Sequence, residues 1–290
     1  MDGKQLRVIQ NAIQTRKTVV DLNQTWKVLH VDYQVGKKHG RQLHLSSSDL
    51  AMLEAIYTRH SKVSPAVNID LKQNRVALID YYKDEKIGGF NVFADQLVFA
   101  SISAELPLKT GAVNIGFQGL LATTTLDQVD ISAIKRLMIV ENGAMINRLF
   151  DWQDNLSCDW KNSLFLYRGH GHNINIVLNL LENLPETSSI AFYGDLDPYG
   201  IHIATHLNRI KPLGIVVPKI WRELKSNHVD NNMSKHLKQI VHCADLSLDA
   251  SVPFAFREIF KYLQLNQIAI MQENVNRLGQ LEVIFESINV

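Results

Sequence analysis

From about Asp127 onward, short apolar strands alternate with helical patterns, and this alternation limits the possible folds more than any other feature. The segments RLMIVE (136–141), SLFLY (163–167) and SIAFYGD (189–195) have the composition of buried strands, whereas AMINRLFDW and NINIVLNLLENL have the apolar spacing of helices. Strands that alternate with helices form a parallel sheet with crossover helices on its faces. The sequence therefore predicts an α/β domain over residues 126–290.

Residues 1–125 follow a different pattern and are predicted to form a separate N-terminal region. Residues 4–30 have helical apolar spacing, and Ser46–Ser48 with Asp49 can cap a second helix. Between them, the basic segment GKKHGR (36–41) is flanked by alternating apolar residues, as in a β-hairpin or wing. Residues 66–124 have the composition of short strands and turns. We expect a basic, winged-helix-like helical region that ends near residue 125.

Charge is unevenly distributed along the chain. Residues 1–62 hold ten Lys/Arg and five Asp/Glu, a net charge of +5, whereas residues 63–290 hold twenty and twenty-four, a net charge of −4. Such asymmetry can mark an arm that faces nucleic acid beside an acidic site, although a solvated helical face has the same composition. In the first interpretation, Lys37, Lys38 and Arg41 contact DNA phosphates without reading the base sequence.

Three carboxylates fall at predicted strand ends. Glu141 ends the strand that begins at Arg136, and Asp195 and Asp197 follow the strand that begins at Ser189. Loops at the carboxyl edge of a parallel sheet converge on one crevice, so neighbouring strands would bring all three side chains to one pocket. Clustered carboxylates repel one another, and their hard oxygen atoms suit Mg²⁺ or Mn²⁺. The sequence therefore predicts an acidic metal site.

Basic residues lie near the same predicted edge of the sheet. The turn RGHGH (168–172) follows a third strand, and Arg168 and His170 are candidates for phosphate contacts at a helix start. Lys219 follows the strand GIVVP and can neutralise phosphate charge at that edge. Alternatively, residues 168–172 form a glycine-rich turn with surface histidines, and Lys219 is an ordinary surface lysine.

The motifs together resemble a known domain. Glu141 at a strand end with Gly143 after it, followed by GDLDPYG (194–200), is similar to the Toprim domain shared by topoisomerases, bacterial primases and several nucleases. The stretch GDLDPYGIHIA is most similar to the topoisomerase VI A-subunit branch. With AIKRLMIVEN and LFLYRGHGHNINIVLNLL, residues 127–210 resemble the C-terminal half of JetD or MksG, the nuclease subunit of Wadjet plasmid-defence systems.

This resemblance implies roles for individual residues and for the chain. Glu141 would act as general acid/base and contact the metal, Asp195 and Asp197 would hold Mg²⁺ or Mn²⁺, and Gly143, Gly194 and Gly200 would allow tight turns. The implied activity is sequence-nonspecific hydrolysis of double-stranded plasmid DNA. The implied assembly is a homodimer that acts with a condensin-like SMC ATPase complex containing a kleisin.

Three alternative functions remain open. Relatives of the topoisomerase VI A subunit cleave DNA through a tyrosine, for which Tyr57, Tyr81 and Tyr82 are candidates, but no supporting motif surrounds them. Metal-dependent hydrolysis is favoured because several groups occur in matched roles. A primase-like polymerising protein and a noncatalytic DNA-binding subunit are the other two alternatives.

The sequence also predicts a cytoplasmic protein without a membrane partner. No run of roughly 18 or more apolar residues occurs, and the N-terminus lacks the apolar segment of a secretory signal. Cys158 and Cys243 are too few for a disulfide framework and are expected to be reduced, packed thiols.

Overall fold

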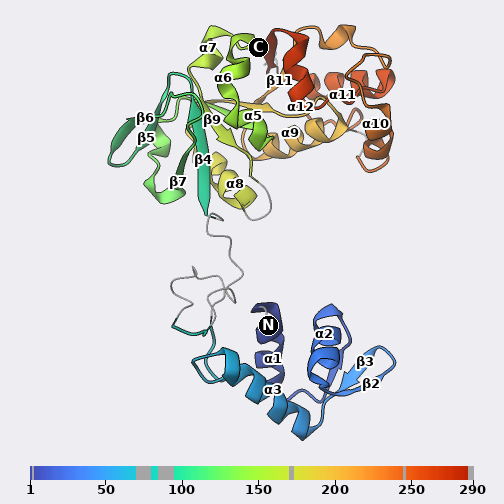
Figure 1. Ribbon diagram of the computed structural model, residues 1–290. Coiled ribbons are helices and arrows are strands. Elements are labelled where there is room, and N and C mark those ends of the chain that lie inside the picture. Colours follow the sequence, from blue (N-terminus) through green and yellow to red (C-terminus); the bar gives the residue numbers. More distant parts are fainter. Residues whose placement is uncertain (2, 70–79, 84–94, 170–172, 244–245, 287–290) are drawn as a thin grey trace. The chain divides into compact units, whose positions relative to one another are not determined.

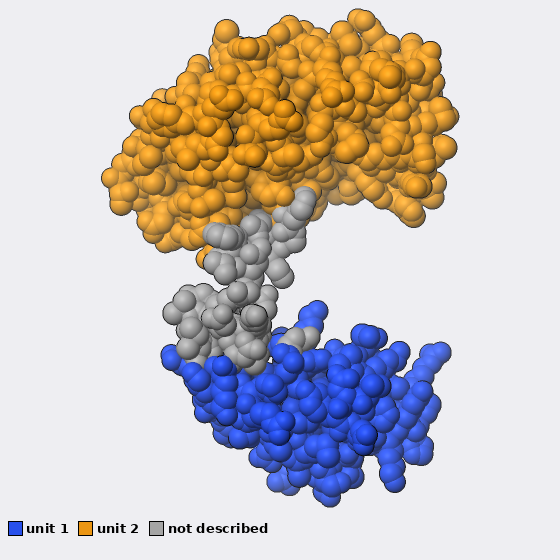
Figure 2. Space-filling model, viewed as in Figure 1, with its two compact units in different colours: residues 1–94 blue, residues 95–290 orange. Residues whose placement is uncertain are grey.

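A computed structural model describes residues 1, 3–69, 80–83, 95–169, 173–243 and 246–286 (Figure 1). The chain divides into two compact units, unit 1 (residues 1–94) and unit 2 (residues 95–290) (Figure 2). The boundary expected near residue 125 therefore lies inside unit 2. The difference arises because strands between residues 96 and 125 pair with the sheet of unit 2, and composition alone does not reveal which sheet a short strand joins.

Unit 1 contains three helices and a three-stranded antiparallel sheet in its described part. The elements are α1 (Gly3–Gln14), β1 (Val19–Asp21), α2 (Gln24–Tyr33), β2 (Lys37–His39), β3 (Gln42–His44) and α3 (Ser47–His60). The sheet order is β1-β3-β2. The helical prediction for residues 4–30 is wrong in its middle, because Arg16 has a φ of 46°, β1 follows, and Asn23 caps a new helix through the backbone N–H of Trp26.

The predicted basic hairpin and the cap of the next helix are both confirmed. Strands β2 and β3 pair with His39 opposite Gln42, and Gly40 has a φ of 58°, which glycine adopts readily at a two-residue turn. Ser46 Oγ accepts from the backbone N–H of Asp49 at 3.2 Å, and the Asp49 carboxylate accepts from the N–H of Ser46 at 2.7 Å. This capping box fixes the start of α3.

Unit 2 is an α/β structure with a seven-stranded mixed sheet, in the order β12-β11-β10-β8-β9-β4-β7. Its strands are β4 (Gln96–Ser101), β5 (Glu105–Leu108), β6 (Gly111–Asn114), β7 (Ala122–Thr125), β8 (Arg136–Val140), β9 (Leu164–Tyr167), β10 (Ser189–Tyr193), β11 (Gly214–Pro218) and β12 (Leu281–Ile284). The predicted parallel sheet is confirmed for β8, β9, β10 and β11. Strands β4, β7 and β12 add antiparallel edges, and β5 and β6 form a separate hairpin.

The helices of unit 2 follow the strands in the expected alternation. They are α5 (Gly143–Asn147), α6 (Leu149–Trp152), α7 (Cys158–Lys161), α8 (Asn173–Asn183), α9 (Pro198–Ile210), α10 (Met233–Ile240), α11 (Phe254–Asn266) and α12 (Gln272–Val275). Single 3₁₀ turns cover Leu126–Gln128, Ile131–Ala133, Gln153–Asn155, Trp221–Glu223 and Asn276–Leu278. No helix in the described ranges is long and apolar enough to cross a membrane.

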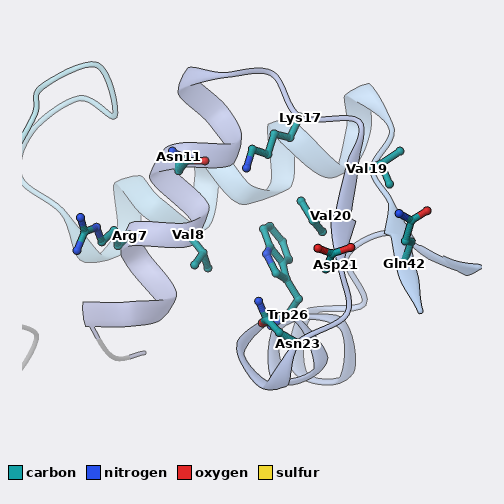
Figure 3. A pocket seen from close by; sticks show the side chains of 10 residues that line it. All are labelled: Arg7, Val8, Asn11, Lys17, Val19, Val20, Asp21, Asn23, Trp26 and Gln42. Carbon is teal, nitrogen blue, oxygen red and sulfur yellow. The ribbon is translucent and has the colours of Figure 1, made fainter. Parts of the chain in front are cut away.

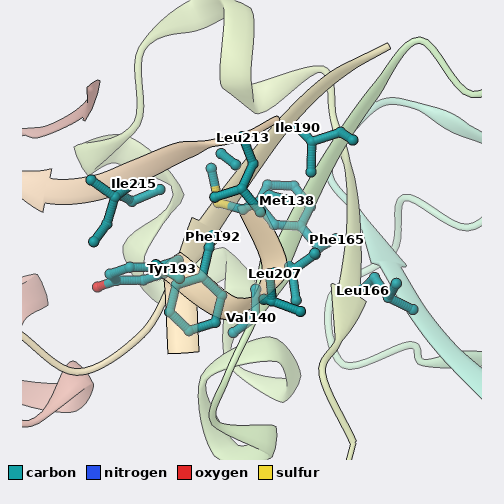
Figure 4. Close-up of a cluster of buried hydrophobic side chains, with 14 of the residues drawn as sticks. Met138, Val140, Phe165, Leu166, Ile190, Phe192, Tyr193, Leu207, Leu213 and Ile215 are labelled. Atoms are coloured by element: carbon teal, nitrogen blue, oxygen red, sulfur yellow. The ribbon is translucent and has the colours of Figure 1, made fainter. Parts of the chain in front are cut away.

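The core of unit 2 surrounds its central strands. Successive residues of a strand point to opposite faces of a sheet, and all four residues from Leu137 to Val140 are fully buried. Both faces of β8 are therefore covered along these four residues, which explains why all four are apolar. Figure 4 shows Met138, Phe165 and Phe192 from neighbouring strands within this cluster. The two cysteines are free, and the expectation of packed thiols is wrong for Cys158, which is exposed on the short helix α7.

Candidate functional site at the carboxyl edge of the sheet

The pairing of β8 with β10 brings the predicted carboxylates to one edge of the sheet. The strands run parallel with Val140 opposite Tyr193, and the backbone N–H of Glu141 donates to the Tyr193 carbonyl at 2.9 Å. Glu141 Oε2 in turn accepts from the backbone N–H of Asp195 at 3.3 Å. The structure thus brings Glu141 beside the loop that carries Asp195 and Asp197, as the sequence predicts.

Asp197 is the most buried of the three carboxylates, with 1% of its side chain exposed. Its Oδ1 accepts from the backbone N–H of Gly200 at 2.7 Å and so caps α9. Its Oδ2 accepts from Gln239 Nε2, which lies on α10, at 2.8 Å. Asp197 therefore connects the start of α9 to α10.

Gln272, at the start of α12, joins the ends of both strands. This fully buried side chain donates to the Tyr193 carbonyl at 3.1 Å and accepts from the backbone N–H of Asn142 at 3.1 Å. Its backbone N–H donates to Asp195 Oδ1 at 2.7 Å. Gln272 therefore holds the turns after β8 and β10 in register, although no motif in the sequence distinguishes it.

Lys235 supplies the positive charge closest to the two aspartates. Its Nζ lies 2.6 Å from Asp195 Oδ2 and 2.9 Å from Asp197 Oδ2, and 26% of its side chain is exposed. Asn232 accepts from the backbone N–H of Lys235 and caps α10, which positions the lysine in the first turn of that helix. Sequence reasoning missed Lys235 because it lies far along the chain from the strand-end motifs.

Of the basic residues predicted near this edge of the sheet, only Arg168 is seen to contact a carboxylate in the described chain. Arg168 follows β9, and its guanidinium lies 3.6 Å from Glu141 Oε1, while its buried Nε has no hydrogen-bond partner among the described residues. His170 lies outside the described residues. Lys219 is exposed at the end of β11, on the same edge of the sheet, and within the described chain no hydrogen bond or ion pair joins its side chain to the carboxylates.

Burial and charge set the protonation of the site. Burial, together with the negative charge of Asp195, raises the pKa of Glu141 above its usual value, and the nearby Arg168 guanidinium opposes this only in part. Burial lowers the pKa of Lys235, but the charges of Asp197 and Asp195 outweigh burial and leave that pKa raised. Glu141 is therefore suited to proton transfer, whereas Lys235 remains a cation.

The three predicted glycines serve different purposes. A Cβ on Gly200 would lie 2.0 Å from the Asp195 carbonyl oxygen, and one on Gly194 would lie 2.5 Å from Glu141 Oε2. Both residues therefore permit close packing of the site. Gly143 has room for a Cβ, whose nearest neighbour would be the Tyr167 ring at 3.5 Å. None of the three has a positive φ, so it is the close approach of other atoms, and not a left-handed backbone, that requires glycine at positions 194 and 200. Gly143 lacks this steric requirement.

The donor atoms fit a hard divalent cation in kind. Glu141, Asp195 and Asp197 supply carboxylate oxygens. The buried Gln239 Oε1, whose own side-chain N–H donates to Asp197, has no hydrogen-bond partner in the described chain. Among the described residues, however, no three acidic, histidine or cysteine side chains converge as a ready ligand set. The position between Asp195 and Asp197 is held by the Lys235 ammonium group.

Unit 1 carries a second candidate region, a polar hollow of about 440 Å³ (Figure 3). Arg7, on α1, and Lys17 line it together with the mostly buried Trp26. An adjoining hollow of about 550 Å³ is lined by Lys27 and by the predicted hairpin residues Lys38 and Arg41. The two hollows share Asp21 and Asn23. The predicted basic tip is thus part of a wider basic surface on unit 1.

Comparison with known proteins assigns the main part of the chain to a family. The model of a domain of unknown function, DUF7281, matches residues 94–279, which is well over half of the chain. The match starts at the junction of the two units and includes every site residue from Glu141 to Gln272. No curated protein matches the chain.

The close packing at Gly200 leads to a stability prediction. Gly200→Ala should lower the free energy of unfolding of unit 2 by about 1–3 kcal/mol, because the new Cβ must displace the Asp195 backbone. Gly143→Ala is the matched control and should have a much smaller effect, since its Cβ makes an ordinary contact. Urea denaturation measures both variants, and equal losses of stability would contradict the packing argument.

Proposed function

Because the chain belongs to the DUF7281 family, described only as a domain of unknown function, we propose its function from the site: unit 2 is a Toprim-type domain that hydrolyses DNA phosphodiester bonds with Mg²⁺ or Mn²⁺. One observation carries this proposal. Glu141 and the pair Asp195 and Asp197 follow two parallel strands that are direct neighbours, with Glu141 bonded to the backbone of Asp195. This is the arrangement that the sequence predicts from the convergence of loops at the carboxyl edge of a parallel sheet.

Each group of the site has a role in the proposed reaction. A Mg²⁺ or Mn²⁺ ion held by Glu141, Asp195 and Asp197 would supply charge stabilisation to the phosphodiester. The raised pKa of Glu141 and the 21% exposure of its side chain suit it to proton transfer with solvent or substrate. The guanidinium of Arg168 has donors that match phosphate oxygens, and 17% of the side chain is exposed.

We further propose that unit 1 binds the phosphate backbone of double-stranded DNA without sequence preference. The support is the basic surface that Arg7, Lys17 and Lys27 share with the hairpin residues Lys38 and Arg41. The resemblance to JetD and MksG extends this proposal to plasmid defence, with a homodimer that acts beside a condensin-like SMC ATPase and its kleisin.

Two observations bear on the alternatives. Tyr57 is fully buried and Tyr82 is 3% exposed in the core of unit 1, and burial, with the nearby Tyr57, raises the pKa of Tyr82 to about 12. Neither side chain is presented as a nucleophile, which argues against these two candidates for tyrosine transesterification. Tyr81 is only partly buried against the same core and stays a candidate. By contrast, the oxygens of Asp195 and Asp197 all accept from protein donors, which favours the alternative of a noncatalytic DNA-binding subunit. Cleavage assays distinguish these possibilities.

The carboxylates should be required for cleavage. Separate Glu141→Gln, Asp195→Asn and Asp197→Asn variants should lose nicking of supercoiled plasmid in Mn²⁺ by roughly 10²-fold or more, because each loses a charge at the proposed metal site. Glu105→Gln, at an exposed position on β5, is the control and should cleave normally. Circular dichroism checks that the variants are folded. Undiminished nicking by all three site variants would reject the proposed active site.

The basic hairpin should contribute to DNA affinity whatever the base sequence of the DNA. Combined Lys37→Ala, Lys38→Ala and Arg41→Ala changes should weaken binding and reduce the slope of log affinity against log salt by about 0.9 for each phosphate that the protein no longer neutralises. The control removes the same charge from exposed positions of unit 2, Lys109, Lys225 and Lys261. Fluorescence anisotropy over a salt series measures the slope. Identical slopes for the two triple variants would show that the hairpin does not bind DNA.

Hydrolysis should leave free DNA ends and should not need the Tyr57 hydroxyl. Tyr57→Phe keeps the buried ring and should retain cleavage, whereas Glu141→Gln should not. Denaturing gels of end-labelled DNA, with and without protease treatment, show whether protein is attached to the cut strand. A protease-sensitive shift that Tyr57→Phe abolishes would establish a covalent tyrosine mechanism in place of hydrolysis.

A further inference from the structure

Lys235 lies where two carboxylates would otherwise face one another without a cation. Its Nζ contacts Asp195 Oδ2 at 2.6 Å and Asp197 Oδ2 at 2.9 Å. The Asp197 side chain is 1% exposed, so it has little access to solvent that would screen its charge. The ammonium group therefore compensates the negative charge of both aspartates, which solvent screens only weakly.

Helix α10 is held in place on the side that carries Lys235. His236, the next residue, is 2% exposed, and its Nδ1 lies 3.0 Å from the Ile268 carbonyl oxygen. Gln239, one turn after Lys235, donates to Asp197. The backbone N–H of Asn232, the N-cap residue, donates to the Ala269 carbonyl at 2.9 Å. These contacts hold the first turn of α10, and with it the backbone of Lys235, against the site.

From these contacts we infer that Lys235 is a built-in competitor of the divalent cation, and that its ammonium group must leave Asp195 and Asp197 before a metal ion can bind them both. This inference rests on the metal site of the proposed function and adds a determinant of its metal affinity. Lys235 keeps the site electrostatically balanced when no metal is bound. Metal binding then requires breaking two ion pairs, so the wild-type site binds divalent cations weakly.

Manganese binding to the full-length protein tests the inference. Free Mn²⁺ is measured by electron paramagnetic resonance at fixed pH and ionic strength for the wild type, Lys235→Gln, Lys235→Arg and Lys238→Gln. We expect Lys235→Gln to bind Mn²⁺ at least about tenfold more tightly, because it removes the cation that competes for two buried or partly buried carboxylates. Lys235→Arg keeps the charge and should bind weakly. Lys238 is exposed on the same helix, and its replacement should change little.

The outcomes separate this inference from the proposed function. Equal and measurable Mn²⁺ affinities of the wild type and Lys235→Gln would overturn the inference alone, provided that Glu141→Gln still abolishes cleavage. If Lys238→Gln increased the Mn²⁺ affinity as much as Lys235→Gln, the inference would also be overturned. The gain would then come from the lower net charge of the protein and not from the loss of the two ion pairs. Failure of all four proteins to bind Mn²⁺ would reject the metal site and the inference with it.

A second measurement uses the unmodified protein and avoids any effect of substitution on folding. If Mn²⁺ displaces the ammonium group, saturating Mn²⁺ should increase the acylation of Lys235 by an amine-reactive ester severalfold, as measured by peptide mass spectrometry. Lys238 provides the internal reference and should react equally with and without the ion. An unchanged acylation rate of Lys235 at saturating Mn²⁺ would overturn the inference.

Discussion

The parallel pairing of β8 with β10 is the constraint on which the rest of the site depends. With Val140 opposite Tyr193, the residue after β8 must lie beside the loop after β10, and both positions carry acidic side chains. The sheet therefore forces like charges together, at an energetic cost that the surrounding structure has to offset. The ion pairs of Lys235, the Arg168 guanidinium and the hydrogen bonds from Gln272 and Gln239 are the local means by which this chain offsets it.

Hydrogen bonds and nearby cations stabilise the three carboxylates to different extents. Asp197 is satisfied by a helix cap, an amide and an ammonium group, whereas Glu141 has one long backbone hydrogen bond and a guanidinium at 3.6 Å. The weaker compensation agrees with the raised pKa of Glu141. A carboxyl group with incomplete compensation at an accessible sheet edge is the kind of group that exchanges protons, while a fully bonded one keeps the fold in place.

Local sequence signals predicted much of the structure, and the failures have physical causes. Local patterns reveal the ends of the strands that precede Glu141 and Asp195, the β2–β3 hairpin and the cap at Ser46, because each depends on neighbouring residues. The antiparallel edge strands depend on a choice of partner that β-branched composition does not encode. Lys235 and Gln272 could not be found for a similar reason, because their roles arise only when segments distant in sequence pack against the strand ends.

Gln272 also has a consequence for the order in which the site is assembled during synthesis. The ribosome produces Glu141, Asp195 and Lys235 well before residue 272, yet the turns after β8 and β10 are joined only when Gln272 reaches them. Until that point a nascent chain can pair β8 with β10 but lacks the three hydrogen bonds by which Gln272 joins the turns that follow them. A final strand, β12, must then emerge to cover the edge of β11. The site is therefore completed only after the segment around Gln272 has been synthesised, more than a hundred residues after Glu141.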